Sequence, residues 1–454
     1  MLLISLVTYI VYISYNQTCI QHVNRLAVVI LSFLLYLAWE SLNIQYSNFT
    51  IYNDWFSYTP SNIPIIILTL LVVVSLLAYT TVKQRYLINN SWLSILIIIN
   101  IAGLILFPMV NDLIPLYVII ELQSYSLYLL TGAYNKSYNS TRAAILYFVT
   151  GGIASVLILL SSCEIYEITG LTNLVDIATF YNNIDSIWSP FNILLIALIF
   201  KMGLAPLHSW SIAVYSYAPI YITAYISIVA KVSIISFIYI HLNAISNEVL
   251  IICFYLSVAV AAYVPLYQVN IKAILAYSGI LNFGYLLIAL ISSDIAYNLY
   301  LIQYSLTHVA IFLCIFGFNT YTNNATSIWS PIVNINQLII PNKAICILLI
   351  ILLLSLVGIP PLPGFFAKYY VIVSLINNGY TLEALTIIFF SVLATYYYAF
   401  IIKQLATNLL SSSIKSENNI SKILSLLLAI YSVLLISFYM FIPTLLDGLV
   451  LLTT

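Results

Sequence analysis

The residues of this chain that are best suited to chemistry are lysines placed inside or beside long apolar runs. Lys201 follows the apolar run 192–200, and Gly203 and Pro206 come directly after it. Glycine is entropically costly in a helix and proline cannot donate a backbone hydrogen bond, so the pair predicts an interrupted helix. In a membrane both the lysine charge and the carbonyls freed by the break need partners. This combination is typical of an ion path.

The same pattern occurs a second time. Gly203-Leu-Ala-Pro-Leu-His-Ser-Trp210 and Gly358-Ile-Pro-Pro-Leu-Pro-Gly-Phe365 share the form G-[LI]-x-P-L-x-x-aromatic, and Lys368 follows the second copy closely. One copy alone is equally well explained by a kinked structural helix whose lysine reaches the surface. Two interrupted apolar segments at matching places in two halves favour an ion path at the interface of internal repeats.

Composition places these segments in a membrane protein. The chain has 454 residues, of which 63% are hydrophobic and 6% charged. The apolar N-terminus lacks a charged region and a cleavage site, so we expect a first span there and not a removable signal. The net charge is zero and no basic run indicates nucleic acid. Five scattered cysteines without C-x-x-C spacing predict no disulfide framework, zinc site or iron–sulfur site.

Hydropathy predicts an all-α polytopic membrane protein of about fourteen transmembrane helices, each near the roughly 20 residues that cross the hydrocarbon. The seventh and twelfth spans contain the two breaks and are therefore expected to be discontinuous, and the longest connections are loop-sized. The expected spans are 1–16, 26–39, 62–82, 92–110, 113–133, 142–163, 191–214, 219–241, 248–268, 271–293, 298–318, 342–376, 383–405 and 423–446.

The placement of charges predicts the topology. Loops after odd-numbered spans carry the basic residues Arg25, Lys83, Arg85, Lys136, Arg142, Lys272, Lys343, Lys403, Lys415 and Lys422. The other loops carry no Lys or Arg, and only Glu417 among the loop acids lies on the basic side. An excess of Lys and Arg marks the inner side, so both termini are expected outside. Subtraction leaves Lys201, Lys231, Lys368 and Glu121 inside the membrane.

These intramembrane charges favour a proton relay over a structural ion pair. Burial disfavours the charged form of either side chain, and an approaching opposite charge restores it, so modest changes in pairing can move a proton. In a purely structural set of ion pairs, the positive and negative charges would be equal in number. Here the intramembrane charges are three lysines and one glutamate. Each charge shares its helix face with polar side chains: Ser124, Tyr125 and Tyr128 beside Glu121, and Thr223 and Ser227 beside Lys231.

For two histidines and one further lysine, a structural role competes with a functional one. His308, with Tyr304 and Ser305 on its face, is either a proton-passing group or a hydrogen-bonded core histidine. His208 between Pro206 and Trp210 is better explained as part of a helix-end clamp. Lys272 begins the tenth span, where an anchor at the inner face is expected.

Several segments resemble the antiporter-like subunits of respiratory complex I, the proton-pumping NADH:ubiquinone oxidoreductase. They extend from the fifth to the twelfth span, and the chain is most similar to the subunit-2 branch of that family in its fungal, mitochondrial form. The matching pieces are Glu121-Leu-Gln-Ser-Tyr-Ser, Lys201-x-Gly-x-Ala-Pro-x-His-x-Trp210, the Lys231 helix, Ile271-Lys-x-x-x-Ala-Tyr-Ser278 and Gly358-x-Pro-Pro-x-x-Gly-Phe-x-x-Lys368.

The resemblance implies a fold and a set of residue roles. It implies N-terminal helices at 1–91, two inverted five-helix repeats at 92–241 and 248–405, and a C-terminal loop and span at 406–454. Glu121 would be the charge partner of Lys201, Lys231 the middle relay and Lys368 the outlet. The resemblance also implies a relay role for His308, but less strongly, because relay roles at the corresponding helix vary between sister subunits.

The resemblance also implies partners and a location. The chain would bind no cofactor itself, while NADH, FMN, iron–sulfur clusters and ubiquinone would be used by partner subunits. The expected partners are membrane-arm subunits, including antiporter-like subunit 4 and small core membrane subunits, together with lipids and the transported protons. The expected location is the mitochondrial inner membrane, with both termini on the intermembrane-space side.

Two other functions remain open at this point. One is a cation/proton antiporter subunit of a multi-subunit complex, which copurification with a flavin- and iron–sulfur-containing assembly would exclude. The other is a passive scaffold in which buried charges only fix the register of helices. Loss of pumping in an assembled Lys201 variant would exclude the scaffold.

Overall fold

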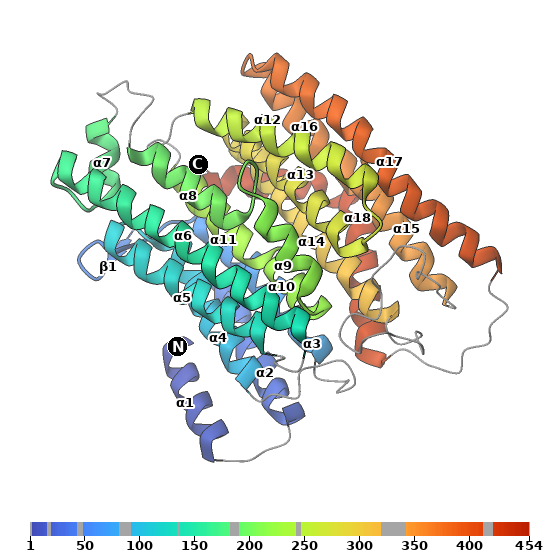
Figure 1. Ribbon diagram of the computed structural model, residues 1–454, viewed down its shortest axis with the longest axis horizontal. Helices are drawn as coiled ribbons and strands as arrows, with labels where there is room; N and C mark the ends of the chain where they lie inside the picture. Colours follow the sequence, from blue (N-terminus) through green and yellow to red (C-terminus); the bar gives the residue numbers. More distant parts are fainter. Residues whose placement is uncertain are drawn as a thin grey trace. The chain divides into compact units, whose positions relative to one another are not determined.

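The computed structural model describes residues 2–15, 20–42, 49–80, 92–133, 137–181, 190–241, 247–318, 342–411 and 421–453. Of the basic residues expected in inner loops, Lys83, Arg85, Lys136 and Lys415 lie outside these ranges, as does Glu417. The described part is almost wholly helical (Figure 1), so the prediction of a helical membrane protein is confirmed.

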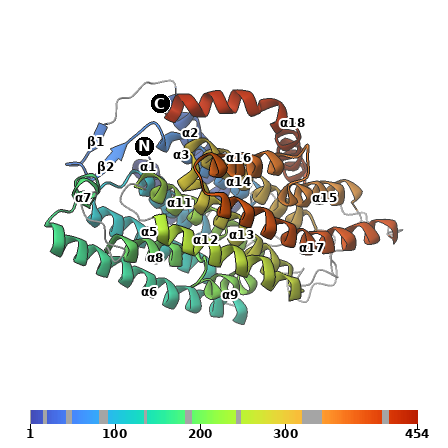
Figure 2. The ribbon, with the colours of Figure 1, turned by 90° about the horizontal axis from the view of Figure 1, so that it is seen from above.

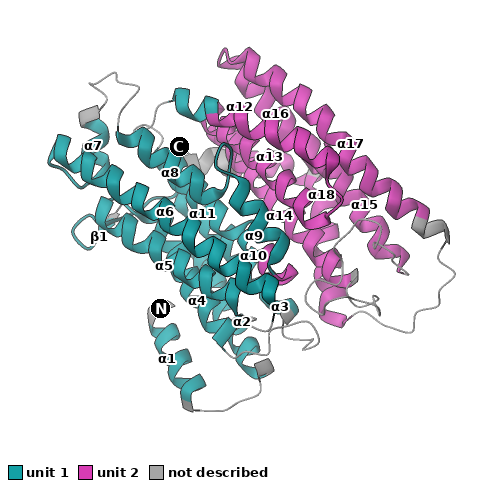
Figure 3. Cartoon of the chain, viewed as in Figure 1, with its two compact units in different colours: residues 1–84, 88–218, 225–252 teal, residues 85–87, 219–224, 253–454 magenta. Residues whose placement is uncertain are grey.

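The chain forms two compact units, which Figure 3 colours separately. The first comprises residues 1–84, 88–218 and 225–252, and the second comprises residues 85–87, 219–224 and 253–454. In the first unit α5 packs between α4 and α6, and α6 also contacts α8 and α9. In the second unit α14 contacts α13, α15, α16 and α18. The four-part division into N-terminal helices, two repeats and a C-terminal segment stays a prediction.

The helices have the following bounds. Those up to residue 240 are α1 (Leu2–Tyr15), α2 (Ile20–Ser41), α3 (Asn62–Thr80), α4 (Trp92–Leu106), α5 (Leu113–Gly132), α6 (Tyr138–Thr169), α7 (Leu174–Tyr181), α8 (Pro190–Met202), α9 (Ser209–Tyr217), α10 (Ile220–Ile226) and α11 (Val229–Ile240). They are followed by α12 (Asn247–Tyr263), α13 (Ile271–Ser292), α14 (Asp294–Phe318), α15 (Lys343–Val357), α16 (Pro363–Asn377), α17 (Thr381–Ser411) and α18 (Lys422–Thr453). Two short 3₁₀ turns, η2 (Phe107–Met109) and η4 (Val264–Tyr267), follow α4 and α12.

Ten of the described helical segments are long and apolar enough to cross a membrane, or eleven if the two parts of α18 form one span. The two parts of α18 meet at 83° (Figure 2). Three further apolar helices in the described ranges, at Ile4–Ser14, Pro190–Met202 and Lys343–Val357, are shorter. The class is therefore confirmed, whereas the count of about fourteen stays a prediction.

Burial separates central from peripheral helices. In the best 18-residue window of Ile271–Ser292, and likewise of Ile220–Ile240, 94% of the residues are buried, against 33% for Tyr138–Thr169 and 28% for Thr381–Thr407. A helix that is apolar all round fits either a buried place or a lipid contact, so the sequence alone does not separate the two. The window in α14 is 89% buried as well. The buried helices α11 and α14 carry Lys231 and His308, and both of these side chains are buried.

Side-chain caps fix several helix starts near the candidate site. Asp112 precedes α5 and its carboxylate accepts hydrogen bonds from the Ile114 N–H at 3.0 Å and the Thr172 hydroxyl at 2.8 Å. Asn270 caps α13 by accepting from the Lys272 N–H. Such caps satisfy N–H groups that a helix start leaves without an intrahelical partner.

A small β-hairpin departs from the all-helical prediction. Strands β1 (Phe49–Ile51) and β2 (Phe56–Tyr58) pair antiparallel across a turn at residues 52–55 (Figure 2). Tyr52, Asn53 and Asp54 all have positive φ. Asn and Asp tolerate this left-handed region better than other residues with side chains, which is why the turn falls there.

Candidate functional site

Glu121 and Lys201 form an ion pair between α5 and the end of α8. The Lys201 Nζ lies 3.2 Å from Glu121 Oε1, and their side chains are 7% and 13% exposed. Lys201 is the penultimate residue of α8, which ends at Met202. The pair therefore joins the interrupted segment to a continuous neighbouring helix.

The backbone groups freed at this break are hydrogen-bonded within the break itself. Gly203 has φ +69°, and its N–H donates to the Phe200 carbonyl at 2.9 Å. The Trp210 indole donates to the same carbonyl at 3.1 Å, and Ser211 donates to the Gly203 carbonyl at 3.3 Å. His208 Nδ1 lies 3.2 Å from the Pro206 carbonyl. The segment is thus a hydrogen-bonded turn, and the Lys201 side chain pairs with Glu121 outside it.

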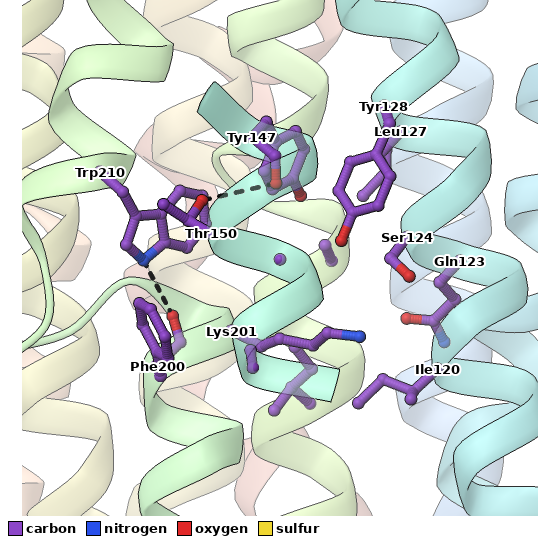
Figure 4. A pocket seen from close by; sticks show the side chains of 14 residues that line it. Ile120, Gln123, Ser124, Leu127, Tyr128, Tyr147, Thr150, Phe200, Lys201 and Trp210 are labelled. Carbon is purple, nitrogen blue, oxygen red and sulfur yellow. Dashed lines mark hydrogen bonds between the residues drawn. The ribbon is translucent and has the colours of Figure 1, made fainter. Parts of the chain in front are cut away.

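A small cavity with several polar side chains in a mainly apolar lining adjoins Lys201. It has a volume of about 20 Å³, and its lining includes Lys201, Gln123, Ser124, Tyr128 and Tyr147. Figure 4 shows the Lys201 amino group directed across the cavity toward the α5 side chains. A cavity needs roughly 10–15 Å³ of such volume and at least two polar partners to hold one water molecule. This cavity meets both conditions.

A hydrogen-bonded network fixes α5 against its neighbours next to Glu121. Gln123 Nε2 donates to the Gly103 carbonyl at 2.8 Å, and Ser233 on α11 donates to Gln123 Oε1 at 3.4 Å. Asn100 on α4 donates to the Gln123 carbonyl at 3.0 Å and accepts from the Tyr225 hydroxyl at 2.7 Å. Such satisfied buried networks hold a site in one geometry.

Lys231 lies deep inside the first unit and is 2% exposed. Its Nζ is 5.4 Å from the centroid of the Tyr215 ring, a cation–π distance. Lys231 is the third residue of α11. An interruption at Ser227 and Ile228 separates α11 from α10. Hydropathy predicts one span at 219–241, and Ile220–Ile240 is long and apolar enough to be one span. Neither Gly nor Pro marks the interruption within it.

Lys368 at the second break has different partners from Lys201. Its Nζ donates to the Leu356 and Val357 carbonyls at 2.8 and 2.9 Å, at the end of α15. Gly358 has φ +92°, and a Cβ placed on it would lie 3.2 Å from Lys368 Cδ. A cation at the C-terminus of a helix is favoured by the helix dipole. Lys368 thus binds backbone carbonyls at the place where Lys201 has a carboxylate.

His308 and Lys272 are both buried in the second unit. His308 is 3% exposed, with its ring 5.5 Å from the Tyr304 ring and 4.9 Å from the Phe312 ring. Lys272 is 6% exposed. Lys272 was expected to be an anchor at the inner face, but in the structure it is one of the buried lysines. Its position at the start of a span concealed this, since burial by neighbouring helices leaves no local pattern.

Neither a metal site nor a disulfide occurs within the described ranges. No group of three or more His, Cys, Asp or Glu side chains among the described residues is placed to share a metal ion. The described cysteines Cys163, Cys253, Cys314 and Cys346 are free. The titratable side chains at the site positions described above are those of Glu121, Lys201, Lys231, His308 and Lys368.

Comparison with known proteins gives consistent relatives. The family model described as "NADH:quinone oxidoreductase/Mrp antiporter, TM" matches residues 110–396. The chain is 68% identical to NADH-ubiquinone oxidoreductase chain 2 of Candida albicans, over 100% of this chain and 96% of the relative. It is 47% identical to the protein of the same name from Debaryomyces hansenii, over 98% of each.

Solved structures share the fold. A chain of respiratory complex I from Thermus thermophilus matches with a TM-score of 0.82 and 21% identity, over 99% of each chain. A chain of the Mrp complex from Dietzia sp. matches with a TM-score of 0.81 and 16% identity, over 99% of this chain and 95% of that one. At these identities the likeness shows a common fold.

Proposed function

Because the chain belongs to the NADH:quinone oxidoreductase and Mrp antiporter family, we propose that it is a proton-translocating membrane-arm subunit of mitochondrial NADH:ubiquinone oxidoreductase. The observation that carries this proposal is the buried ion pair between Glu121 and Lys201, placed at an interrupted helix. The full-length likeness to relatives named as chain 2 of that enzyme favours this assembly over an Mrp antiporter.

The relay works through changes in pairing. While Glu121 contacts Lys201, the carboxylate favours the ammonium form of the lysine. When the pair opens, burial favours the neutral amine, and the proton of Lys201 leaves by way of the adjoining cavity toward Lys231. His308 and Lys368 continue the relay in the second unit, with Lys368 as the outlet. Moving one charge through 100 mV takes ~2.3 kcal/mol, which is within the free energy of making or breaking a buried pair.

The chain does no redox chemistry in this proposal. NADH, FMN, iron–sulfur clusters and ubiquinone are used by partner subunits, whose conformational change opens and closes the Glu121 pair. The chain's partners in the inner membrane are other membrane-arm subunits, including antiporter-like subunit 4 and the small core membrane subunits. Two inverted repeats, 92–241 and 248–405, each contribute one discontinuous span, and both termini face the intermembrane space.

The proposal is tested by Glu121→Gln and Lys201→Ala in the intact complex. We expect both variants to assemble but to lose proton pumping and coupled quinone reduction together, because each removes one member of the pair. The loss should be on the order of 10²-fold, as for other positioned proton-transfer groups. Pumping is measured with a pH-sensitive dye in sealed vesicles, and assembly on native gels.

Matched controls come from charged residues outside the relay. Glu383→Gln changes a buried carboxylate that accepts a hydrogen bond from Tyr255 at 2.9 Å, and Lys403→Ala removes an exposed lysine of α17. Both controls should pump normally. Full pumping in the assembled Glu121 and Lys201 variants would overturn the relay and leave a scaffold. Copurification without flavin and iron–sulfur subunits would instead favour an antiporter complex.

A further inference from the structure

A cluster of buried tyrosines occupies the interior of the second unit. Its members come from α13, α14 and α17, and each is at most 2% exposed: Tyr285, Tyr300, Tyr304, Tyr397 and Tyr398. The rings of Tyr285 and Tyr300 are 6.3 Å apart, and those of Tyr397 and Tyr398 are 4.4 Å apart. Each of the five side chains lies near at least one other member of the set. We call this set the tyrosine cluster.

One edge of the tyrosine cluster is held by polar groups of α13. The Tyr300 hydroxyl donates to Asn282 Oδ1 at 2.8 Å, and Asn282 Nδ2 donates to the Ser278 carbonyl at 2.7 Å. The Tyr398 hydroxyl also approaches Ser278 and Asn282. The bond to Asn282 fixes the direction of the Tyr300 hydroxyl.

Within the described residues, the Tyr285 hydroxyl lacks a hydrogen bond like that of Tyr300. It is buried, and it has no hydrogen-bond partner in the described part of the chain. A buried hydroxyl without a partner costs more free energy than a formed hydrogen bond contributes. Apolar side chains would serve this place better unless water binds there, and buried water typically serves such groups. A phenol in this position is therefore suited to binding internal water.

The tyrosine cluster extends between two groups of the proposed relay. At one end the Tyr304 ring lies 5.5 Å from the His308 ring. At the other end the Lys368 Nζ lies 5.9 Å from the centroid of the Tyr285 ring. An ammonium has three donors, and Lys368 gives two hydrogen bonds to the Leu356 and Val357 carbonyls. The third N–H donor of Lys368 is available to water bound beside Tyr285.

We propose that the tyrosine cluster is a water-binding site that conducts protons between His308 and Lys368, with the Tyr285 side chain as the member beside the lysine. This inference rests on the proposed function. A proton delivered through bound water bonds to the Tyr285 hydroxyl oxygen while the original hydroxyl proton passes through further bound water to the neutral Lys368 amine. The phenol ends neutral, the amine becomes an ammonium, and one proton has moved without forming a tyrosinate.

The test is Tyr285→Phe in the intact complex, which keeps the ring beside Lys368 and removes only the hydroxyl. We expect normal assembly and normal NADH oxidation with an artificial acceptor that bypasses the membrane arm. Coupled turnover and proton pumping should fall about tenfold, below the range for a direct proton-transfer group because bound water can partly replace the hydroxyl. The slowdown on changing from H₂O to D₂O should be larger in the variant, which a purely structural role would not produce.

Tyr297→Phe is the matched control, because Tyr297 is equally buried in α14 but is not part of the tyrosine cluster. It should leave pumping and the isotope effect unchanged. A density map of the wild-type complex should show ordered water at the Tyr285 hydroxyl. A dry, tightly packed hydroxyl, or unchanged pumping in Tyr285→Phe, overturns the inference. If Lys201→Ala abolishes pumping while Tyr285→Phe does not, only this inference fails, and the proposed function stands.

Discussion

Lys201 and Lys368 stand beside similar helix interruptions but differ in what neutralises them. Lys201 pairs with a carboxylate on another helix, at 3.2 Å, whereas Lys368 binds two carbonyls at the end of α15. A carboxylate can itself take up a proton, but backbone carbonyls cannot. The first lysine therefore has a partner that can switch its charge state, and the second has a fixed one. This difference fits a switch at Glu121 and an outlet at Lys368.

The Glu121–Lys201 pair predicts a strong coupling between the two residues in stability. Lys201→Met should leave the carboxylate buried without its cation, and removing one partner of a buried pair typically costs about 3–5 kcal/mol. Because both side chains keep some exposure, we expect the lower end of that range. The double variant Glu121→Gln with Lys201→Met should recover most of the loss. Stability is measured as the temperature at which assembled complex disappears from native gels.

The same set of variants separates stability from function. The double variant should be stable but should not pump, because it contains neither the carboxylate nor the amine. If the single variant is as stable as the double one, the pair is not coupled. If the double variant pumps, the two charges serve only to hold the helices together.

At the level of single residues, two features of the sequence predicted the Glu121–Lys201 pair. They were the free-energy cost of an unpaired charge in the membrane and the resemblance to antiporter-like subunits. An intramembrane lysine beside Gly203 and Pro206 needs a partner, and Glu121 was the only intramembrane acid available. The burial of Lys272 could not be predicted, because nothing near a span's first turn tells whether other helices cover it. The relay roles of Glu121, Lys201, Lys231, His308 and Lys368 stay predictions until the variants are measured.

At the level of helices, the interruption after α8 depends on one glycine. Gly203 has φ +69°, and a Cβ on it would lie 2.5 Å from Ser211 Cβ. Gly203→Ala should therefore destabilise the first unit by about 2 kcal/mol or more, from the left-handed backbone and from overpacking. The control Gly152→Ala, in the interior of α6, meets no atom within 4 Å and should not destabilise. Thermal loss of assembled complex distinguishes the two, and equal stability would contradict this reading of the turn.

Breaks with Gly and Pro were predictable, whereas others were not. The ends of α8 at Met202 and of α15 at Val357 follow from residues with known backbone preferences. The break between α10 and α11 contains Ser227 and Ile228, which carry no such preference, so tertiary packing decides it. The β1–β2 hairpin has a recognisable signal in the sequence, the Asn53-Asp54 turn between aromatic residues.

At the level of the whole molecule, the family could be predicted because its motifs are spread over most of the chain. The match of residues 110–396 to the family model confirms that prediction. The membrane class was predictable from hydropathy for a similar reason, because hydropathy is averaged over many residues and depends little on any single one. The number of spans is harder, because helices such as α8 and α15 are shorter than a full crossing while α6 and α17 are longer.

Orientation in the membrane gives the last prediction. The charge bias places Lys422 on the matrix side and Asp447 on the intermembrane-space side, so α18 should connect the two faces despite its bend of 83°. Both side chains are exposed, which allows single cysteines to be placed there. In a background lacking exposed Cys163, Asp447→Cys should react with an impermeant thiol reagent in mitochondria whose outer membrane is opened. Lys422→Cys should react only in inside-out vesicles. Labelling of both positions from one face would mean that α18 does not cross, and that the assignment of odd-numbered loops to the matrix is wrong.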